Sequence, residues 1–164
     1  MNEIELTIHQ RHERLLKIVR KTYQAENNGA RIFENTSGMA WQGEIKTISG
    51  RTAILSAHPV FFGIPSPKMK GAGADSGGAD LIGETLINEI PVFTAIEIKT
   101  GKSRLRENQK IFKNWVKSIN GIYFVARECS KCWDTWEPIY KSNRIVGWAI
   151  PECDMCHGKG YIEE

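Results

Sequence analysis

Two acids and a lysine in one short region of the chain could together bind a divalent metal ion. Glu97 and Lys99 are separated by one residue, and Asp80 lies 17 residues before Glu97. Residues two apart in a β-strand project from the same face, so Glu97 and Lys99 would share one side. Two carboxylates and the backbone carbonyl of Ile98 would supply the oxygen ligands that Mg²⁺ or Mn²⁺ prefers. Such an ion activates water, and a nearby lysine stabilises the charge on a reacting phosphate.

The spacing of these residues leaves two interpretations open, a metal centre or a salt bridge between neighbouring strands. Gln109 favours the first, because it lies on the apolar stripe of an expected helix, where an amide is costly unless hydrogen-bonded. We therefore expect it to point at the charged residues, although it could also lie at the edge of the stripe. Gly77 and Gly78 precede Asp80 and allow another backbone or a ligand to approach closely.

Four cysteines, all after residue 128, predict a second and different metal site. They form two Cys-x-x-Cys pairs separated by 20 residues, at Cys129, Cys132, Cys153 and Cys156. This spacing is typical of a structural zinc ribbon, in which four thiolates bind Zn²⁺ tetrahedrally. Unrelated thiol pairs or a redox pair are the alternatives, and His157 could replace one thiolate.

Three tryptophans lie between the two cysteine pairs. Trp133, Trp136 and Trp148 are expected to form the small core of this segment. A platform on which nucleic-acid bases stack is the alternative role for these rings.

The positive charge of the chain is concentrated in residues 99–127. This stretch carries eight Lys and Arg against Glu107 alone, a net of +7, whereas the whole chain carries +3. Residues 128–164 carry a net of −3, which argues against phosphate binding there. A concentrated positive stretch is what a polyanion-binding surface needs, although a solvated helix face would look alike. The expected nucleic-acid-binding residues are Lys102, Arg104, Arg106, Lys110 and Lys113.

The elements that must position these residues follow from the apolar patterns. A helix is expected over residues 4–24 and another over 103–119. Strands are expected at Ala30–Phe33, at Thr52–Leu55, from Asp80, at Val92–Lys99 and at Ile122–Ala126. The strand, helix and strand after residue 92 predict a β-α-β unit, and hence an α/β sheet.

Four segments follow one another in the order of a known family's motifs. They are Gly77–Gly83, Ala95–Lys99, Leu105–Gln109 and Gly121–Arg127. In this order they resemble the VRR-NUC branch of the PD-(D/E)xK nucleases, and the resemblance covers residues 3 to 127. It implies a restriction-endonuclease-like core, a mixed central sheet flanked by helices, as a nuclease domain over residues 1–127. The small zinc-ribbon-like module would then occupy residues 128–164.

The resemblance also implies roles for single residues. Asp80 and Glu97 would bind the metal, Lys99 would be the catalytic lysine, and Gln109 would support the centre. The family carries a glutamate on its first helix, for which Glu13 is expected and Glu5 stays open. In an insertion relative to the family, Asp75 is a weaker competitor for the acid role.

The activity implied is that of a Mg²⁺- or Mn²⁺-dependent endonuclease acting on DNA. Branched DNA such as a Holliday junction is one expected substrate, and a homodimer would then be needed to cut two strands symmetrically. Two other functions stay open from the residues themselves. One is a non-catalytic nucleic-acid-binding module with salt-bridged acids, and the other is an interaction protein organised by zinc.

The location of the protein is expected to be cytoplasmic, with no membrane partner. No apolar run reaches the roughly 20 residues needed to cross a bilayer. The N-terminal residues lack the basic-then-apolar order of a signal peptide. The family resemblance suggests a bacterial or viral origin, phages included.

Overall fold

A five-stranded mixed sheet forms the centre of the protein. The computed structural model describes residues 6–36, 38–48, 51–62, 78–141 and 144–164. The sheet has the order β1-β4-β5-β6-β9, in which β5 and β6 run parallel and the other neighbours run antiparallel. Its strands are β1 (Arg31–Glu34), β4 (Leu81–Ile87), β5 (Ile90–Lys99), β6 (Ile122–Glu128) and β9 (Tyr161–Glu163). The predicted mixed α/β architecture is therefore confirmed, whereas a restriction-endonuclease-like core stays a prediction.

Strands β4 and β5 form a hairpin that brings the predicted acids together. Its turn contains Asn88 and Glu89, both with positive φ, as two-residue hairpin turns require. Leu81 pairs with Ile96, and extending this register by one residue places Asp80 opposite Glu97. Helix α2 (Glu107–Ser118) then connects β5 to β6, since parallel strands need a crossover. The predicted β-α-β unit is thus present.

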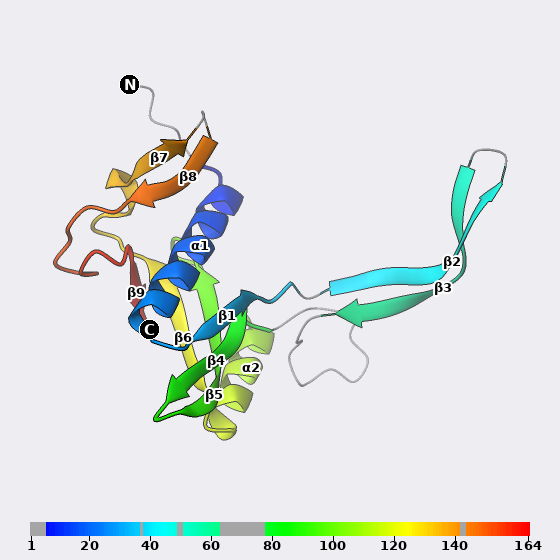
Figure 1. The fold of residues 1–164 in the computed structure, drawn as a ribbon, viewed down its shortest axis with the longest axis horizontal. Helices are drawn as coiled ribbons and strands as arrows, with labels where there is room; N and C mark the ends of the chain where they lie inside the picture. Colours follow the sequence, from blue (N-terminus) through cyan, green and yellow to red (C-terminus); the bar gives the residue numbers. More distant parts are fainter. Residues whose placement is uncertain (1–5, 37, 49–50, 63–77, 142–143) are drawn as a thin grey trace.

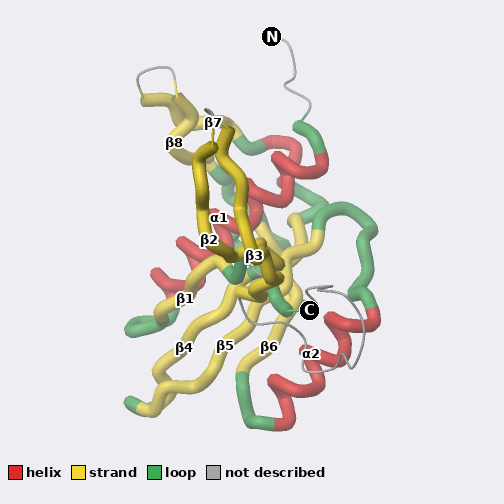
Figure 2. Tube along the Cα trace, turned by 90° about the vertical axis from the view of Figure 1, so that its right-hand side faces the viewer, coloured by secondary structure: helices red, strands yellow, loops and turns green. Residues whose placement is uncertain are grey.

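Helices α1 (Ile8–Glu26) and α2 cover opposite faces of the sheet (Figures 1 and 2). Successive residues of a strand point to opposite faces, so β5 contributes to both cores. Ile96 and Ile98 are buried in the cluster that contains Leu15 and Val19 of α1. Ala95 is buried in the cluster that contains Phe112 of α2.

Helix α1 was expected from residue 4 but begins later, at Ile8. Thr7 is its N-cap, because its hydroxyl accepts a hydrogen bond from the Gln10 amide at 3.2 Å. The Gln10 side chain in turn accepts the Thr7 N–H at 2.9 Å. This reciprocal capping box satisfies two amides that would otherwise lack a partner at the helix start.

Two hairpins lie outside the central sheet. Strands β2 (Gly38–Ile48) and β3 (Arg51–Phe62) form a long antiparallel ribbon that projects from the body (Figure 1). The predicted strand Thr52–Leu55 falls within β3. Strands β7 (Glu137–Lys141) and β8 (Arg144–Ala149) form the second hairpin, between the two cysteine pairs.

The C-terminal segment leaves the sheet after β6 and returns to it as β9. Ala126 pairs with Glu163, so the last strand extends the sheet beyond β6. Trp133 and Trp136 are buried in the same cluster as Leu15 of α1. The tryptophans therefore do not form a small core of their own. They belong to a core shared with α1 and the sheet, because both rings pack toward α1. The domain boundary after residue 127 stays a prediction.

Neither described helix has the length and apolarity that a bilayer crossing requires.

Candidate metal centres

A cavity of about 420 Å³ lies where β5 ends and the chain enters α2. Asp80 directly precedes β4, and Glu97 and Lys99 lie at the end of β5; all three side chains line the cavity. Gln109 reaches it from the first turn of α2, and Ile98 also lines it. Five of the residues predicted for the catalytic centre are thus gathered around one cavity.

Glu97 is the most buried charged residue of this cavity, with 1% of its surface exposed. Its Oε1 accepts hydrogen bonds from the Lys99 ammonium, at 2.8 Å, and from the Gln109 amide. The Gln109 carbonyl oxygen accepts from Lys99 at 2.9 Å and from the Arg106 N–H at 3.0 Å. Gln109 therefore points at the charged residues, as expected. It also caps α2, which begins at Glu107 rather than at residue 103.

The second carboxylate oxygen of Glu97 is the feature that a metal ion would explain. Oε2 is buried and has no hydrogen-bond partner among the residues that the structure describes. Burial, as the main cause, and the negative charge of Asp80 together raise the pKa of Glu97 to about 8. A buried oxygen without a partner beside a second acid is costly unless a cation compensates it. The acids and the cavity therefore fit a divalent ion.

Asp80 is held by the backbone of β5 and faces the first helix. Its Oδ2 accepts the Ile98 N–H at 2.8 Å, which fixes the orientation of the carboxylate. Its Oδ1 lies 3.5 Å from Nε2 of His12, which also lines the cavity. Hydrogen bonding to Asp80 raises the pKa of His12. His12 is a site residue that sequence reasoning missed, although it directly precedes Glu13, the expected first-helix residue.

Glu13 itself is half-buried and is not among the residues that line the cavity. Its role in the centre stays a prediction. The alternative residues Glu5 and Asp75 lie outside the described residues.

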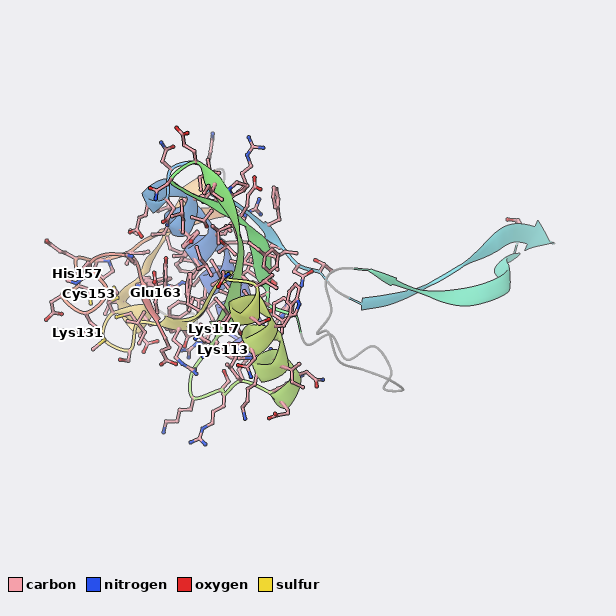
Figure 3. All side chains as sticks on the ribbon, turned by 90° about the horizontal axis from the view of Figure 1, so that it is seen from below. Lys113, Lys117, Lys131, Cys153, His157 and Glu163 are labelled. Carbon is pink, nitrogen blue, oxygen red and sulfur yellow. The ribbon has the colours of Figure 1, made fainter. Side chains whose placement is uncertain are left out.

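The five expected nucleic-acid-binding residues lie in different settings. Arg106 lines the cavity, whereas Lys102 and Arg104 are exposed beside it in sequence. Lys110 pairs with Glu107 at 3.2 Å, and the ammonium of Lys113 lies 5.9 Å from the Tyr123 ring centroid. Figure 3 shows Lys113 and Lys117 on α2, away from the region of Lys131, Cys153 and His157.

The four cysteines form a second, buried cluster. Their sulfur atoms all lie within 4.8 Å of one another. The Cys129 and Cys153 sulfurs are 3.7 Å apart, and the Cys132 and Cys156 sulfurs are 3.5 Å apart. Tetrahedral Zn–S bonds of about 2.3 Å would separate the sulfurs by roughly 3.8 Å. The predicted ligands are therefore already gathered at the spacing of a structural metal such as zinc, and His157 is not part of the cluster.

The backbone around the second cysteine pair supports thiolates. The Gly160 N–H donates to the Cys156 sulfur at 3.3 Å, and the Cys156 N–H lowers the pKa of Cys153 to about 7. Gly160 has φ of +79°, and a Cβ there would lie 2.1 Å from the Trp136 ring. Both the turn and its packing thus require glycine at this position.

Helix α1 is fastened to the cysteine segment by two arginines. The Arg14 guanidinium lies 4.6, 4.1 and 3.7 Å from three ring centroids, those of Trp133, Trp136 and Trp148. Burial lowers the pKa of Arg14 to about 10. These rings therefore pack on a cation of the protein itself, rather than forming an open platform for bases.

Arg11 makes the second connection, through Glu128 at the end of β6. Its guanidinium donates to both carboxylate oxygens of Glu128, at 2.9 and 2.8 Å. The same carboxylate accepts the Gly101 N–H at 2.9 Å, just after Lys99. One carboxylate thus joins α1, the loop beside the cavity and the strand that leads into Cys129.

Comparison with known proteins adds no assignment to this geometry. No profile of a known protein family matches the chain, and no curated protein sequence matches it. The VRR-NUC resemblance therefore stays a prediction from four motifs, and the chemistry of the site must be argued from its own residues.

Proposed function

We propose that the protein is a nuclease that hydrolyses DNA phosphodiester bonds with Mg²⁺ or Mn²⁺. The observation that carries this proposal is the buried Oε2 of Glu97, which lies beside Asp80 in a polar cavity and has no partner within the described ranges. Two carboxylates in a polar cavity favour a hard divalent cation. A lysine beside that cation can stabilise the negative charge that develops when a phosphate ester is cleaved.

The roles of the residues follow from their contacts. Asp80 would bind the ion through Oδ1, since Oδ2 is engaged by the Ile98 amide. Glu97 would bind it through Oε2, with the Ile98 carbonyl as a further ligand. The bound ion would lower the pKa of a water molecule and screen a phosphate oxygen.

Lys99 and Gln109 both contact the other oxygen of the Glu97 carboxylate, Oε1. The Lys99 ammonium is held between Glu97 and the Gln109 carbonyl oxygen, so it is positioned to stabilise charge on the phosphate. Arg106 at the cavity would contact a neighbouring phosphate. A positive stretch of sequence beside the acids fits a DNA backbone better than a small neutral substrate.

The test is a cleavage panel of linear, flapped and four-way DNA with Mg²⁺ or Mn²⁺. Glu97→Ala should reduce the rate by about 10³-fold or more, because it removes a ligand of the ion and the carboxylate that pairs with Lys99. Glu84→Ala is the matched control, since Glu84 lies on the adjacent strand outside the cavity. Undiminished cleavage by purified Glu97→Ala protein would exclude this mechanism.

Two further outcomes would favour the other functions. Tight binding without cleavage of any substrate in Mn²⁺ would favour a non-catalytic binding module. Negligible DNA affinity at low salt would favour an interaction protein, because contact with Z phosphates should give a log–log salt slope of about −0.9Z. If four-way DNA is cut symmetrically, the active species should be a homodimer, which light scattering of the DNA complex would detect.

A further inference from the structure

His12 is the residue through which helix α1 reaches the acidic cavity. Its Nε2 faces Oδ1 of Asp80 at 3.5 Å, and about 30% of its side chain is exposed. The other oxygen of Asp80 is already engaged by the Ile98 amide. Oδ1 of Asp80 and an imidazole nitrogen of His12 therefore face each other in the lining of the cavity.

The separation of these two atoms suits two ligands of one ion. Hydrogen bonds from nitrogen to oxygen normally measure about 2.7–3.2 Å, so the His12–Asp80 contact of 3.5 Å is a long and weak one. Two ligand atoms at about 2.1 Å from one ion lie roughly 3.0 Å apart in octahedral and 3.4 Å apart in tetrahedral geometry. His12 and Asp80 match the tetrahedral value, and the octahedral arrangement of Mg²⁺ and Mn²⁺ requires the two atoms to approach each other by about 0.5 Å as the ion binds.

The backbone of His12 is held on both sides of the residue. Arg11 is paired with Glu128, and Arg14 is packed on the tryptophans of the cysteine segment. The next residue, Glu13, does not line the cavity. The first helix therefore presents an imidazole nitrogen to the cavity one residue before Glu13, where an acid is expected.

The acidic centre is less assembled than the cysteine cluster. Among the described residues, the four cysteines are the group of three or more His, Cys, Asp or Glu side chains whose ligand atoms all lie within 4.8 Å of one another. Asp80, Glu97 and His12 do not form such a group. Since the backbone of α1 is held, the His12 side chain would have to turn toward Glu97 as an ion binds. We expect weaker, reversible binding here than at the cysteines.

We propose that Nε2 of His12 is a third side-chain ligand of the ion held by Asp80 and Glu97, and that it makes this centre favour Mn²⁺ over Mg²⁺. This inference rests on the proposed function, since it deepens the same site. Mg²⁺ prefers oxygen ligands and keeps its waters, whereas imidazole is a typical ligand of transition metals. A site with two carboxylates and one imidazole should therefore discriminate between the two ions.

The test measures metal binding by the zinc-loaded full chain, without DNA. Titration calorimetry gives the affinities for Mn²⁺ and Mg²⁺, and pulsed electron paramagnetic resonance of bound Mn²⁺ detects a directly coordinated imidazole nitrogen. The wild type should show this nitrogen signal and bind Mn²⁺ about tenfold or more tightly than Mg²⁺. His12→Ala and His12→Gln should lose the signal and about tenfold of the Mn²⁺ affinity, with less than about threefold change for Mg²⁺.

Two variants separate this inference from the proposed function. His9→Ala changes another histidine of the same helix, one that is exposed and outside the cavity, and should leave the signal and both affinities unchanged. Glu97→Ala should weaken both ions. If Glu97→Ala does so while the wild type lacks the nitrogen signal, or His12→Ala keeps its Mn²⁺ affinity, the assignment of His12 is overturned and the acidic centre stands. If Glu97→Ala binds both ions normally, the acidic centre and the His12 assignment fail together.

Discussion

The two candidate metal centres of this protein are built in opposite ways. The four cysteines come from two short motifs, and their sulfurs lie within 4.8 Å of one another at the edge of the main core. Asp80, Glu97 and His12 come from three elements, and each already has contacts to protein groups. We therefore expect the cysteine cluster to retain its ion and the acidic centre to exchange one. The comparison indicates that ligands gathered before the ion arrives should hold it more firmly than ligands that must rearrange.

Disrupting the cysteine cluster should have the largest effect. Cys153→Ser should remove most of the zinc contribution to folding, which reaches about 10–16 kcal/mol in small zinc sites, and lower the Tm by more than about 10 °C. Withholding Mg²⁺ and Mn²⁺ should change the Tm by less than about 2 °C. Thermal unfolding with elemental analysis for zinc checks both arms. An unchanged Tm in Cys153→Ser would show that the cluster holds no structural metal.

Removing the arginine between the tryptophans should have the next largest effect. Arg14→Ala should destabilise the protein by about 2–3 kcal/mol, because it leaves a cavity and removes contacts with three rings. Arg14→Lys should restore only part of this, since an ammonium does not stack as a guanidinium does. Urea unfolding measures the difference, with the exposed Lys17→Ala on the same helix as control. Equal stability of Arg14→Ala and wild type would contradict the contact between α1 and the cysteine segment.

The buried acid should give a smaller effect that depends on pH. The pKa of Glu97 is raised from 4.5 to about 8, so the folded state retains a proton that the unfolded state releases between these values. Stability without Mg²⁺ or Mn²⁺ should therefore fall as pH rises through this window. Glu97→Gln cannot lose that proton, so its Tm should match wild type near pH 4.5 and exceed it by a few degrees near pH 8.5. A Tm difference that is independent of pH would contradict the raised pKa.

A single exposed lysine should have the smallest effect. Lys102→Ala should reduce the log–log salt slope of DNA binding by about 0.9 and weaken binding a few-fold, if Lys102 contacts one phosphate. Lys131→Ala is the control, because Lys131 is paired with Asp154 beside the cysteines. Fluorescence anisotropy at several salt concentrations measures both. Equal slopes in the two variants would place the DNA path away from residue 102.

The sequence predicts those parts of the fold whose signal is local. The alternation along Val92–Lys99, the amphipathic pattern of α2 and the apolar run at Ile122 each specify one element, and all three are present. The cysteine spacing likewise specifies a cluster without knowledge of the rest. The convergence of Asp80 with Glu97 needed only a hairpin, which is also a short-range structure.

Contacts between distant segments could not be predicted in this way. Strand β9 has three residues, too few for a periodic pattern, and its pairing with β6 depends on where the cysteines return the chain. Arg14 reads as a solvent-facing charge in the helix pattern, and only the three tryptophans make its burial favourable. His12 carries no spacing relation to Asp80, because 67 residues of intervening chain separate them.

Glu128 limits which cysteine segments can be exchanged between proteins of this architecture. Its carboxylate holds Arg11 of α1 and the Gly101 amide, although it stands directly before Cys129 at the start of the cysteine segment. A chimera that joined a foreign cysteine segment after residue 127 would replace this carboxylate while leaving both of its partners behind. Only a donor with an acid at that position, and with rings that accept Arg14, could be grafted without also exchanging α1. The two regions should therefore vary together, as a pair, in any engineered library.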